Sequence, residues 1–187
     1  MKNVLIISPH ADDEVLSSWT YILLSLKEKI KLHVIYQAIN SDDKRLKLVE
    51  EISKEMNFTY DIACLGYDAI MDTINMKEVV SYYDKNMVGY DEIIIPSLSF
   101  HQDHYVANRA SISALRRNNS SSISIAEHPF NISHFIVDFK PNRYIPFDNM
   151  NEKIECLNRY KPYLRQQDID TTVKLNIFRG EQIGKKY

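Results

Sequence analysis

The chain has 187 residues, and 23 Lys and Arg against 25 Asp and Glu give a formal net charge of −2 at pH 7. This length predicts a single domain, residues 1–187, whose core is large enough to be stable without disulfide bonds. The near-neutral charge argues against a nucleic-acid-binding protein, which would carry a basic surface, and only four glycines, in no phosphate-loop pattern, argue against a nucleotide-binding loop.

No targeting or membrane segment is expected. The apolar run Val4–Ile7 is too short for a signal peptide, and Trp19–Leu26 is too short to cross a membrane. The two cysteines, Cys64 and Cys156, form neither a disulfide framework nor a metal-binding pair. We therefore expect a cytoplasmic protein with no transmembrane segment and no nucleic-acid partner, and the sequence leaves open whether it forms a homo-oligomer.

Strands and helices alternate along most of the chain. Apolar runs predict strands at 4–8, 32–37, 60–65, 92–96, 123–127 and 135–139. Helical periodicity predicts helices at 12–27, 44–56, 76–87, 103–117 and 151–164, whereas 168–187 permit no assignment. Strands that alternate with helices favour a mostly parallel sheet with right-handed crossovers, so the predicted fold class is a Rossmann-like three-layer α/β/α sandwich.

Two polar segments follow two of the predicted strands. Pro9-His10-Ala11-Asp12-Asp13-Glu14 comes after the first strand, and His101-Gln102-Asp103-His104 comes after the fourth. In doubly wound sheets, ligands bind outside the carboxyl ends of the strands, where the strand order reverses. The first and fourth strands flank that point in the commonest order. We therefore expect the two segments to face each other across one cleft.

The residue types in these segments predict a hydrolytic metal site. Two histidines and a carboxylate with an open coordination position suit Zn²⁺ or another divalent metal, which lowers the pKa of bound water from 15.7 to about 7. A second carboxylate could accept the proton of that water, and a remaining imidazole could stabilise an oxyanion. His10 and Asp13 are three residues apart, as are His101 and His104, so each pair shares a helix face. Spacing alone does not distinguish His101 from His104, or Asp12 from Asp13.

These motifs resemble those of the LmbE-like (PIG-L) family of metal-dependent N-acetylglucosaminyl deacetylases. Residues 9–14 match the family's Pro-His-Pro-Asp-Asp-Glu motif, residues 101–104 match its His-Pro-Asp-His motif, and the similarity covers nearly the whole chain. The resemblance implies that His10, Asp13 and His104 are the ligands of Zn²⁺, with Fe²⁺ as an alternative metal.

The resemblance also implies roles for five further residues. Asp12 would be the general base, which later returns its proton to the leaving amine. His101 would be the electrophilic imidazole that faces the oxyanion, with Asp103 beside it as an orienting carboxylate. Arg45 falls where the family often has an arginine that contacts sugar hydroxyls, and Asp68 is expected near the substrate.

The sequence departs from the family pattern outside the reacting groups. Ala11 and Gln102 replace the prolines within the two motifs, which loosens the backbone at a cost of about 1 kcal/mol or less. Ser17 and Ser18 stand in place of glycines, and 37–40 replace a Thr-x-Gly segment. We expect activity to survive these changes, while the identity of the substrate stays open.

Four other residues are candidates for lesser roles. His33 alternates with apolar neighbours, which favours a structural or solvent-facing role. His128 and His134 follow a late strand and are candidates for lining the cleft, and Tyr105 is a candidate for stacking on a sugar ring.

The leading hypothesis is a zinc hydrolase that removes the N-acetyl group from a small-molecule amino sugar, whether free, nucleotide-linked or conjugated. Metal-bound water would be the nucleophile and Asp12 the general base. One alternative is an amidase that acts on a non-sugar N-acyl conjugate. Another is a non-catalytic sugar-binding module on the same scaffold. An iron(II) oxygenase is disfavoured, because such sites usually lie in a β-barrel and this pattern is α/β.

Overall fold

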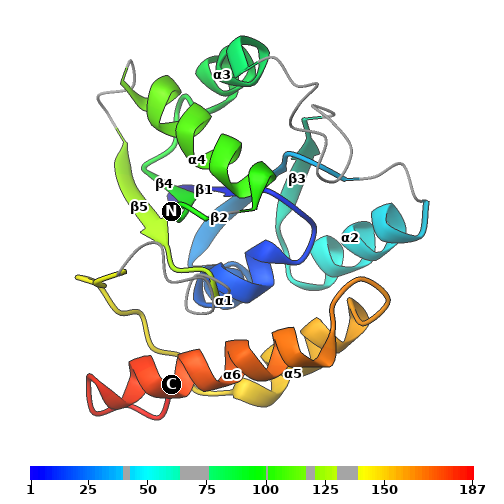
Figure 1. The fold of residues 1–187 in the computed structure, drawn as a ribbon, viewed down its shortest axis with the longest axis vertical. Helices are drawn as coiled ribbons and strands as arrows, with labels where there is room; N and C mark the ends of the chain where they lie inside the picture. Colours follow the sequence, from blue (N-terminus) through cyan, green and yellow to red (C-terminus); the bar gives the residue numbers. More distant parts are fainter. Residues whose placement is uncertain (40–42, 64–75, 100, 117–120, 130–138) are drawn as a thin grey trace.

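The structure, a computed structural model, describes residues 1–39, 43–63, 76–99, 101–116, 121–129 and 139–187. The strands are β1 (Lys2–Ser8), β2 (Ile30–Tyr36), β3 (Thr59–Ile62), β4 (Glu92–Pro96) and β5 (Ser122–Ala126). The helices are α1 (Asp13–Leu26), α2 (Asp43–Glu55), α3 (Met76–Asn86), α4 (Gln102–Leu115), α5 (Met150–Arg159) and α6 (Gln166–Glu181). Figure 1 shows their arrangement.

The five strands form one parallel sheet in the order β3-β2-β1-β4-β5. The strand order reverses between β1 and β4, because the chain runs outward from β1 to β3 on one side and from β4 to β5 on the other. This topology confirms the predicted Rossmann-like fold class. It also confirms that the first and fourth strands are neighbours at the switch point.

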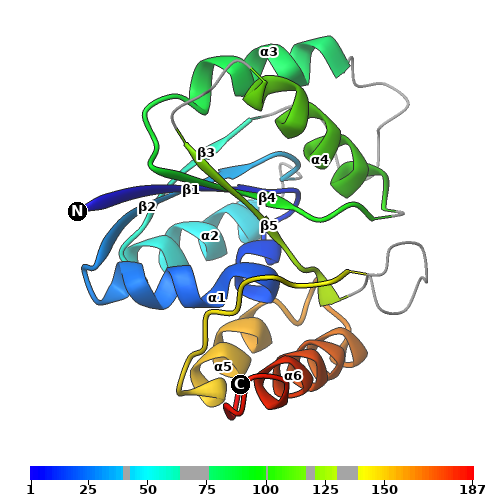
Figure 2. The ribbon, with the colours of Figure 1, turned by 90° about the vertical axis from the view of Figure 1, so that its left-hand side faces the viewer.

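Helices cover both faces of the sheet, so the central strands are apolar on both sides. In β1, Val4 and Ile6 belong to the core cluster shared with α1 and α2, whereas Leu5 and Ile7 belong to the cluster shared with α3 and α4. Figure 2 shows α3 and α4 on one side of the sheet and α1 and α2 on the other. The alternation of side chains along a strand thus divides a continuous apolar run between two cores.

The C-terminal helices α5 and α6 form an additional layer beyond α1 (Figure 2). Cys156 and Leu157 of α5 and Ile169 of α6 are buried in the same core cluster as α1. Because α5 packs against α1 and α6 packs against α5, this pair of helices braces the element that begins at Asp13.

The predicted elements match the structure closely in the first 126 residues and less well afterwards. The helix predicted at 151–164 ends at Arg159, and the unassigned C-terminal segment contains the helix α6. Residues 135–138 of the last predicted strand lie outside the described residues, and Phe139 belongs to no strand. Among the described residues, no helix is long and apolar enough to span a membrane.

Candidate active site

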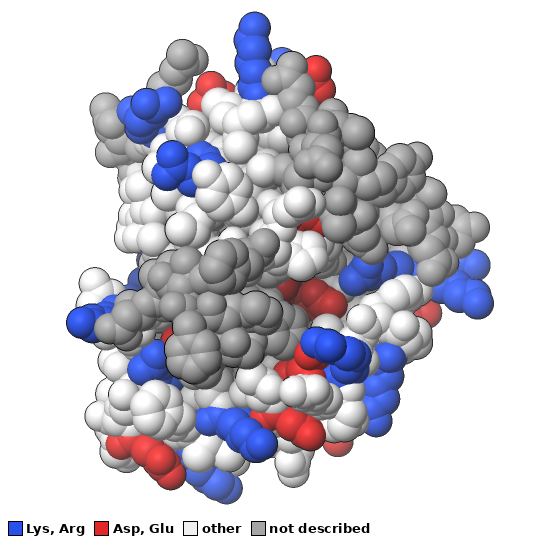
Figure 3. Space-filling view, viewed as in Figure 1, with Lys and Arg blue, Asp and Glu red and all other residues white. Residues whose placement is uncertain are grey.

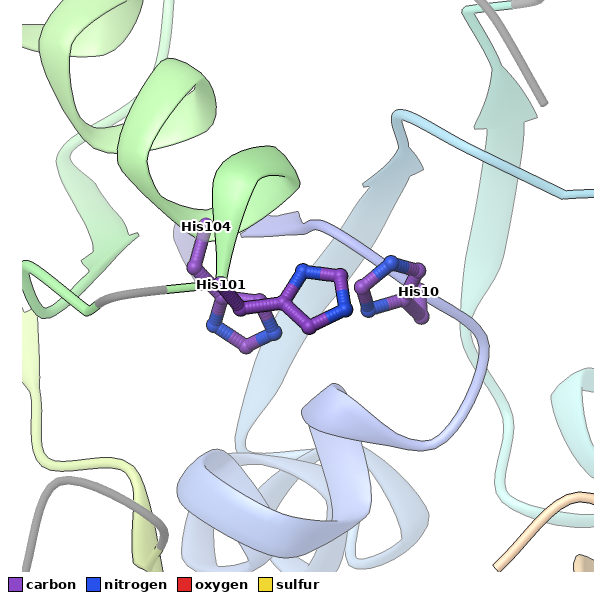
Figure 4. A group of neighbouring side chains, drawn as sticks. All are labelled: His10, His101 and His104. Carbon is purple, nitrogen blue, oxygen red and sulfur yellow. The ribbon is translucent and has the colours of Figure 1, made fainter. Parts of the chain in front are cut away.

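The two polar segments meet at the carboxyl ends of β1 and β4, as their positions in the sequence predicted. His10 lies in the turn that follows β1, whereas His101 and His104 lie at the start of α4, which follows β4. Their three rings point toward one another (Figure 4), and one ring nitrogen from each lies within 4.8 Å of the others. The parallel β1–β4 pairing thus brings together residues more than 90 positions apart in the sequence.

Asp13 is the centre of this cluster. Its Oδ2 atom lies 3.3 Å from Nδ1 of His10 and 3.3 Å from Nε2 of His104. The backbone N–H of His10 also donates a hydrogen bond of 2.9 Å to the same oxygen. Burial alone would raise the pKa of Asp13, but the charge of His104 and hydrogen bonds from the surrounding histidines hold it well below its usual value. The group is therefore a carboxylate at neutral pH.

Asp103 fixes the orientation of His10. Its Oδ2 atom lies 2.9 Å from Nε2 of His10, and the Asp103 side chain is completely buried. With Nε2 paired in this way, Nδ1 of His10 faces Asp13. A carboxylate behind a ligating imidazole is the usual outer-shell partner at metal sites, so Asp103 is placed to orient His10.

The electrostatic environment favours a positive charge between these carboxylates. Burial alone would lower the pKa of His10, but hydrogen bonds to Asp103 and Asp13, together with the charges of Asp13 and Asp12, raise it to about 10. A protonated imidazole is thus stabilised at a position surrounded by three carboxylates. A divalent cation would satisfy the same demand for positive charge and leave His10 neutral as a ligand.

The backbone of Asp12 is strained. Its φ of 151° and ψ of −27° lie in a region that favours glycine and is seldom occupied by other residues. The Asp12 N–H donates a hydrogen bond of 3.0 Å to Oε2 of Glu14, whose side chain is completely buried. In turn, Oε1 of Glu14 accepts a hydrogen bond of 2.8 Å from the hydroxyl of Tyr160, beyond the end of α5. The third acidic residue of the motif therefore supports the turn that presents Asp12 and Asp13.

Asp12 itself has the environment of a proton acceptor. Burial, reinforced by the neighbouring charge of Asp13, raises the pKa of Asp12 well above its usual value. Nη2 of Arg45 lies 3.7 Å from Oδ2 of Asp12, and the Arg45 guanidinium lies 4.7 Å from the ring centroid of Tyr163. A raised carboxyl pKa suits a general base, which must accept a proton readily near neutral pH.

His101 is the most accessible histidine of the cluster and is the N-cap residue of α4. Burial and the charges of His10 and His104 lower the pKa of His101. The N-terminus of a helix favours negative charge, so His101 lies where an oxyanion would be stabilised.

The residues present fit a divalent metal. His10 Nδ1, Asp13 Oδ2 and His104 Nε2 converge, and two imidazoles with one carboxylate are ligands that Zn²⁺ and Fe²⁺ both accept. Asp13, His104 and His128 form a second group whose donor atoms lie within 4.8 Å of one another, and all three residues are buried. The buried Nδ1 of His104 has no hydrogen-bond partner among the described residues.

The structure brings together all but one of the site residues predicted from the sequence: His10, Asp12, Asp13, Arg45, His101, Asp103 and His104. The exception is Asp68, which lies outside the described residues, as do Cys64 and His134. His33 lies in β2, and its side chain contacts Thr59 and Asp61 of β3, so its predicted structural or solvent-facing role agrees with its position. Figure 3, viewed from the same side as Figure 1, shows acidic side chains in a hollow near the middle of the molecular surface.

Three contributors were underestimated or missed by sequence reasoning. His128 was only a candidate for lining the cleft, yet its Nε2 lies 2.8 Å from Oδ1 of Asp13. Tyr160 and Tyr163 come from the C-terminal region and contact Glu14 and Arg45. No local spacing signals these contacts, because they depend on how the C-terminal region packs against α1 and α2.

The chain matches no known protein-family model and no curated protein sequence, but solved structures share its fold. A teicoplanin deacetylase in its zinc-inhibited form superposes with a TM-score of 0.74 at 14% identity, over 100% of this chain and 95% of that one. N,N'-diacetylchitobiose deacetylase from Pyrococcus horikoshii gives a TM-score of 0.66 at 17% identity, over 100% and 81%. The 4-carboxy-2-hydroxymuconate hydratase of Pseudomonas putida gives 0.67 at 14% identity, over 98% and 88%.

At these identities the likeness establishes a shared fold. The likeness of fold extends over nearly the whole chain. Because the same fold occurs in deacetylases and in a hydratase, the fold does not specify the reaction, which must be argued from the residues of the site.

Proposed function

We propose that this protein is a metal-dependent N-deacetylase that hydrolyses the acetamide group of an N-acetylglucosamine-type amino sugar or its conjugate. The observation that carries the proposal is that His10 and His104 both approach one carboxylate oxygen of Asp13. The separate, buried carboxyl group of Asp12 lies beside them. Deacetylases among the proteins of the same fold give the proposal further support.

His10, Asp13 and His104 would hold the metal, Zn²⁺ or alternatively Fe²⁺. A bound Zn²⁺ supplies a Lewis acid that polarises a carbonyl and lowers the pKa of water to about 7. With the metal bound, Asp103 would keep the His10 ring in the tautomer that leaves Nδ1 unprotonated.

The remaining groups would carry out the proton transfers. Asp12 accepts a proton from the water that attacks the acetamide carbon, and His101 stabilises the negative charge that develops on the carbonyl oxygen. Asp12 then donates the proton to the amine nitrogen as the carbon–nitrogen bond breaks. The products are acetate and the free amino sugar, so the water supplies the new acyl oxygen and the proton of the amine.

Arg45 is the candidate for recognising the sugar. It is buried, its guanidinium is beside Asp12 and over Tyr163, and its donors suit hydroxyl oxygens. Asp68 is proposed to contribute to the same binding site, as the sequence resemblance implies.

Asp12→Asn tests the proposed base. The amide keeps the size of the side chain but cannot accept the proton, so turnover should fall by roughly 100-fold or more while bound zinc is retained. The measurements are acetate release from N-acetylglucosamine and zinc content per chain. Asp61→Asn, at an exposed carboxylate that pairs with His33, is the matched control and should leave both values unchanged.

Two results would count against this assignment. Full activity of Asp12→Asn on a substrate that the wild type deacetylates would remove Asp12 from the role of base. Acetate release from simple N-acetyl amines, with none from amino sugars, would instead favour the non-sugar amidase.

A further inference from the structure

Among the described residues, His128 is the buried histidine that the proposed mechanism does not use. It follows β5, and its side chain is 2% exposed. Its Nε2 atom lies 2.8 Å from Oδ1 of Asp13, and its ring centroid lies 4.5 Å from that of His104 at an interplanar angle of 74°. A buried polar ring in contact with two of the proposed metal ligands requires an explanation.

The position of His128 is set by the sheet. The backbone N–H of Ser97 donates to the carbonyl of Ala126 at 3.1 Å, which extends the β4–β5 pairing one residue beyond the end of β4. The N–H of His128 then donates to Oγ of Ser97 at 3.2 Å. Because Ser97 follows β4 just as His101 and His104 do, the same strand end fixes both sides of the cluster.

The two oxygens of Asp13 have different partners. Oδ2 faces His10 and His104, whereas Oδ1 contacts His128. A ring nitrogen that donates its proton to Oδ1 cannot also offer a lone pair to a metal, so His128 is either a hydrogen-bond donor to Asp13 or a fourth ligand. The distance of 2.8 Å is that of a hydrogen bond, and Oδ2 is the oxygen at which the other two ligand atoms converge.

We propose that His128 is a positioning residue of the metal site. Its Nε2–H holds Oδ1 of Asp13, so that the carboxylate presents Oδ2 alone toward His10 and His104. The inference rests on the proposed function, because it assumes that Asp13 binds a metal. It predicts single-oxygen coordination by Asp13, which leaves room for water and substrate. Hydrogen bonds to ligating carboxylates are worth roughly 10- to 100-fold in metal affinity at other sites.

The test compares three substitutions of His128 in zinc titrations of the metal-free protein against a chromophoric chelator. His128→Gln places an amide N–H close to the position of Nε2, His128→Asn carries the same amide on a side chain one methylene shorter, and His128→Leu fills the space without a donor. We expect His128→Leu and His128→Asn to weaken zinc binding by about 10- to 100-fold, and His128→Gln to stay within about threefold of the wild type.

The Co²⁺ absorption spectrum separates a positioning role from a ligand role. If His128 donates to Asp13, the Co²⁺ form of His128→Gln should have the visible bands of the wild type, because the ligand atoms are unchanged. A shifted spectrum together with a loss of affinity as large as in His128→Leu would make His128 a ligand and overturn the proposal. His33→Leu is the matched control, since His33 also contacts an aspartate but lies outside the site, and it should leave zinc affinity unchanged.

The remaining outcomes are also decisive. Equal zinc affinity in the wild type, His128→Leu and His128→Asn would overturn the positioning role and leave the proposed deacetylase function intact. If the wild type binds neither Zn²⁺ nor Fe²⁺, the proposed function fails and the inference fails with it. If His128→Leu does not fold, as judged by its thermal transition, the comparison of His128→Gln with His128→Asn decides the question.

Discussion

Glu14 illustrates how a single buried residue can serve the site without touching the reacting groups. Its carboxyl group accepts hydrogen bonds from Tyr160 and from the backbone of Asp12. Burial raises the pKa of Glu14 to about 7, although these hydrogen bonds oppose the shift. The side chain thus connects the strained turn at Asp12 to the C-terminal helices, and its hydrogen bonds should contribute to stability.

Tyr160→Phe tests this contribution. The substitution keeps the ring but leaves Oε1 of buried Glu14 without its donor, which should lower the free energy of unfolding by about 1–3 kcal/mol. Chemical denaturation measures the change. Tyr144→Phe removes a hydroxyl from a solvent-exposed hydrogen bond with Gln182 and should stay within about 0.5 kcal/mol of the wild type. Equal effects of the two substitutions would contradict the account.

At the scale of residues, the sequence predicted the site residues that lie within local motifs better than those that join the site through long-range contacts. His10, Asp12 and Asp13 lie within four positions, and His101, Asp103 and His104 lie within another four, so each group is recognisable by spacing. His128 is a lone histidine after an edge strand, and its contact with Asp13 depends on the β4–β5 register. The contact of Asp103 with His10 was not predicted, because it depends on how two strand ends face each other. The expected orientation of His101 by Asp103 stays a prediction.

At the scale of elements, the shape of the helix α1 likewise depends on a contact from the C-terminal region. It is interrupted at Ser18, where φ is −129° and ψ is 23°. Nζ of Lys153, from α5, donates to the carbonyl of Leu16 at 2.9 Å and to Oδ1 of Asn176 at 2.8 Å. Contact of a side chain with the helix hydrogen-bond ladder is a recognised cause of such kinks. Lys153 therefore ties α5 and α6 to the helix that begins at Asp13.

Lys153 should also give the stability a characteristic pH dependence. Burial lowers the pKa of Lys153 to about 7 in the folded protein, whereas an unfolded lysine has a pKa of about 10.4. Between these values the unfolded chain holds a proton that the folded protein lacks, so a rise in pH stabilises the folded state, and this contribution is lost as the pH falls through 7.

The measurement is the difference in free energy of unfolding between the wild type and Lys153→Met, determined from pH 7 to pH 10. We expect this difference to shift in favour of the wild type as the pH rises. The same difference for Lys161→Met, at an exposed lysine, gives the baseline. A Lys153→Met profile parallel to this baseline would show that Lys153 is protonated in the folded protein across the range.

At this scale the sequence predicted the elements of the sheet but not α6. The buried positions of α6 include Asp168, Thr172 and Gly180, whereas Ile177 and Phe178 are 39% and 51% exposed. Polar residues share the buried face with Ile169 and Leu175, and apolar residues also lie on the exposed face. The hydrophobic pattern therefore does not reveal this helix. Its N-terminus is capped by Arg165 with Asp168, which is not a typical capping sequence.

The whole molecule forms its candidate site through topology. A parallel sheet places all strand carboxyl ends on one edge, and the order β3-β2-β1-β4-β5 puts the two motif-bearing loops next to each other. The parallel sheet and the meeting of these two loops could be predicted from the alternation of strands and helices in the sequence. The layer formed by α5 and α6 did not, because its packing against α1 is a long-range contact with no local signal.

The most direct test of the central claim is the metal content of the wild type and His104→Ala, purified without added metal, together with acetate release from N-acetylglucosamine. The account predicts about one metal ion per wild-type chain, loss of that ion in His104→Ala, and acetate release that requires the metal. A wild-type protein that binds no metal under any condition would contradict the account, and it would favour a sugar-binding role on the same scaffold.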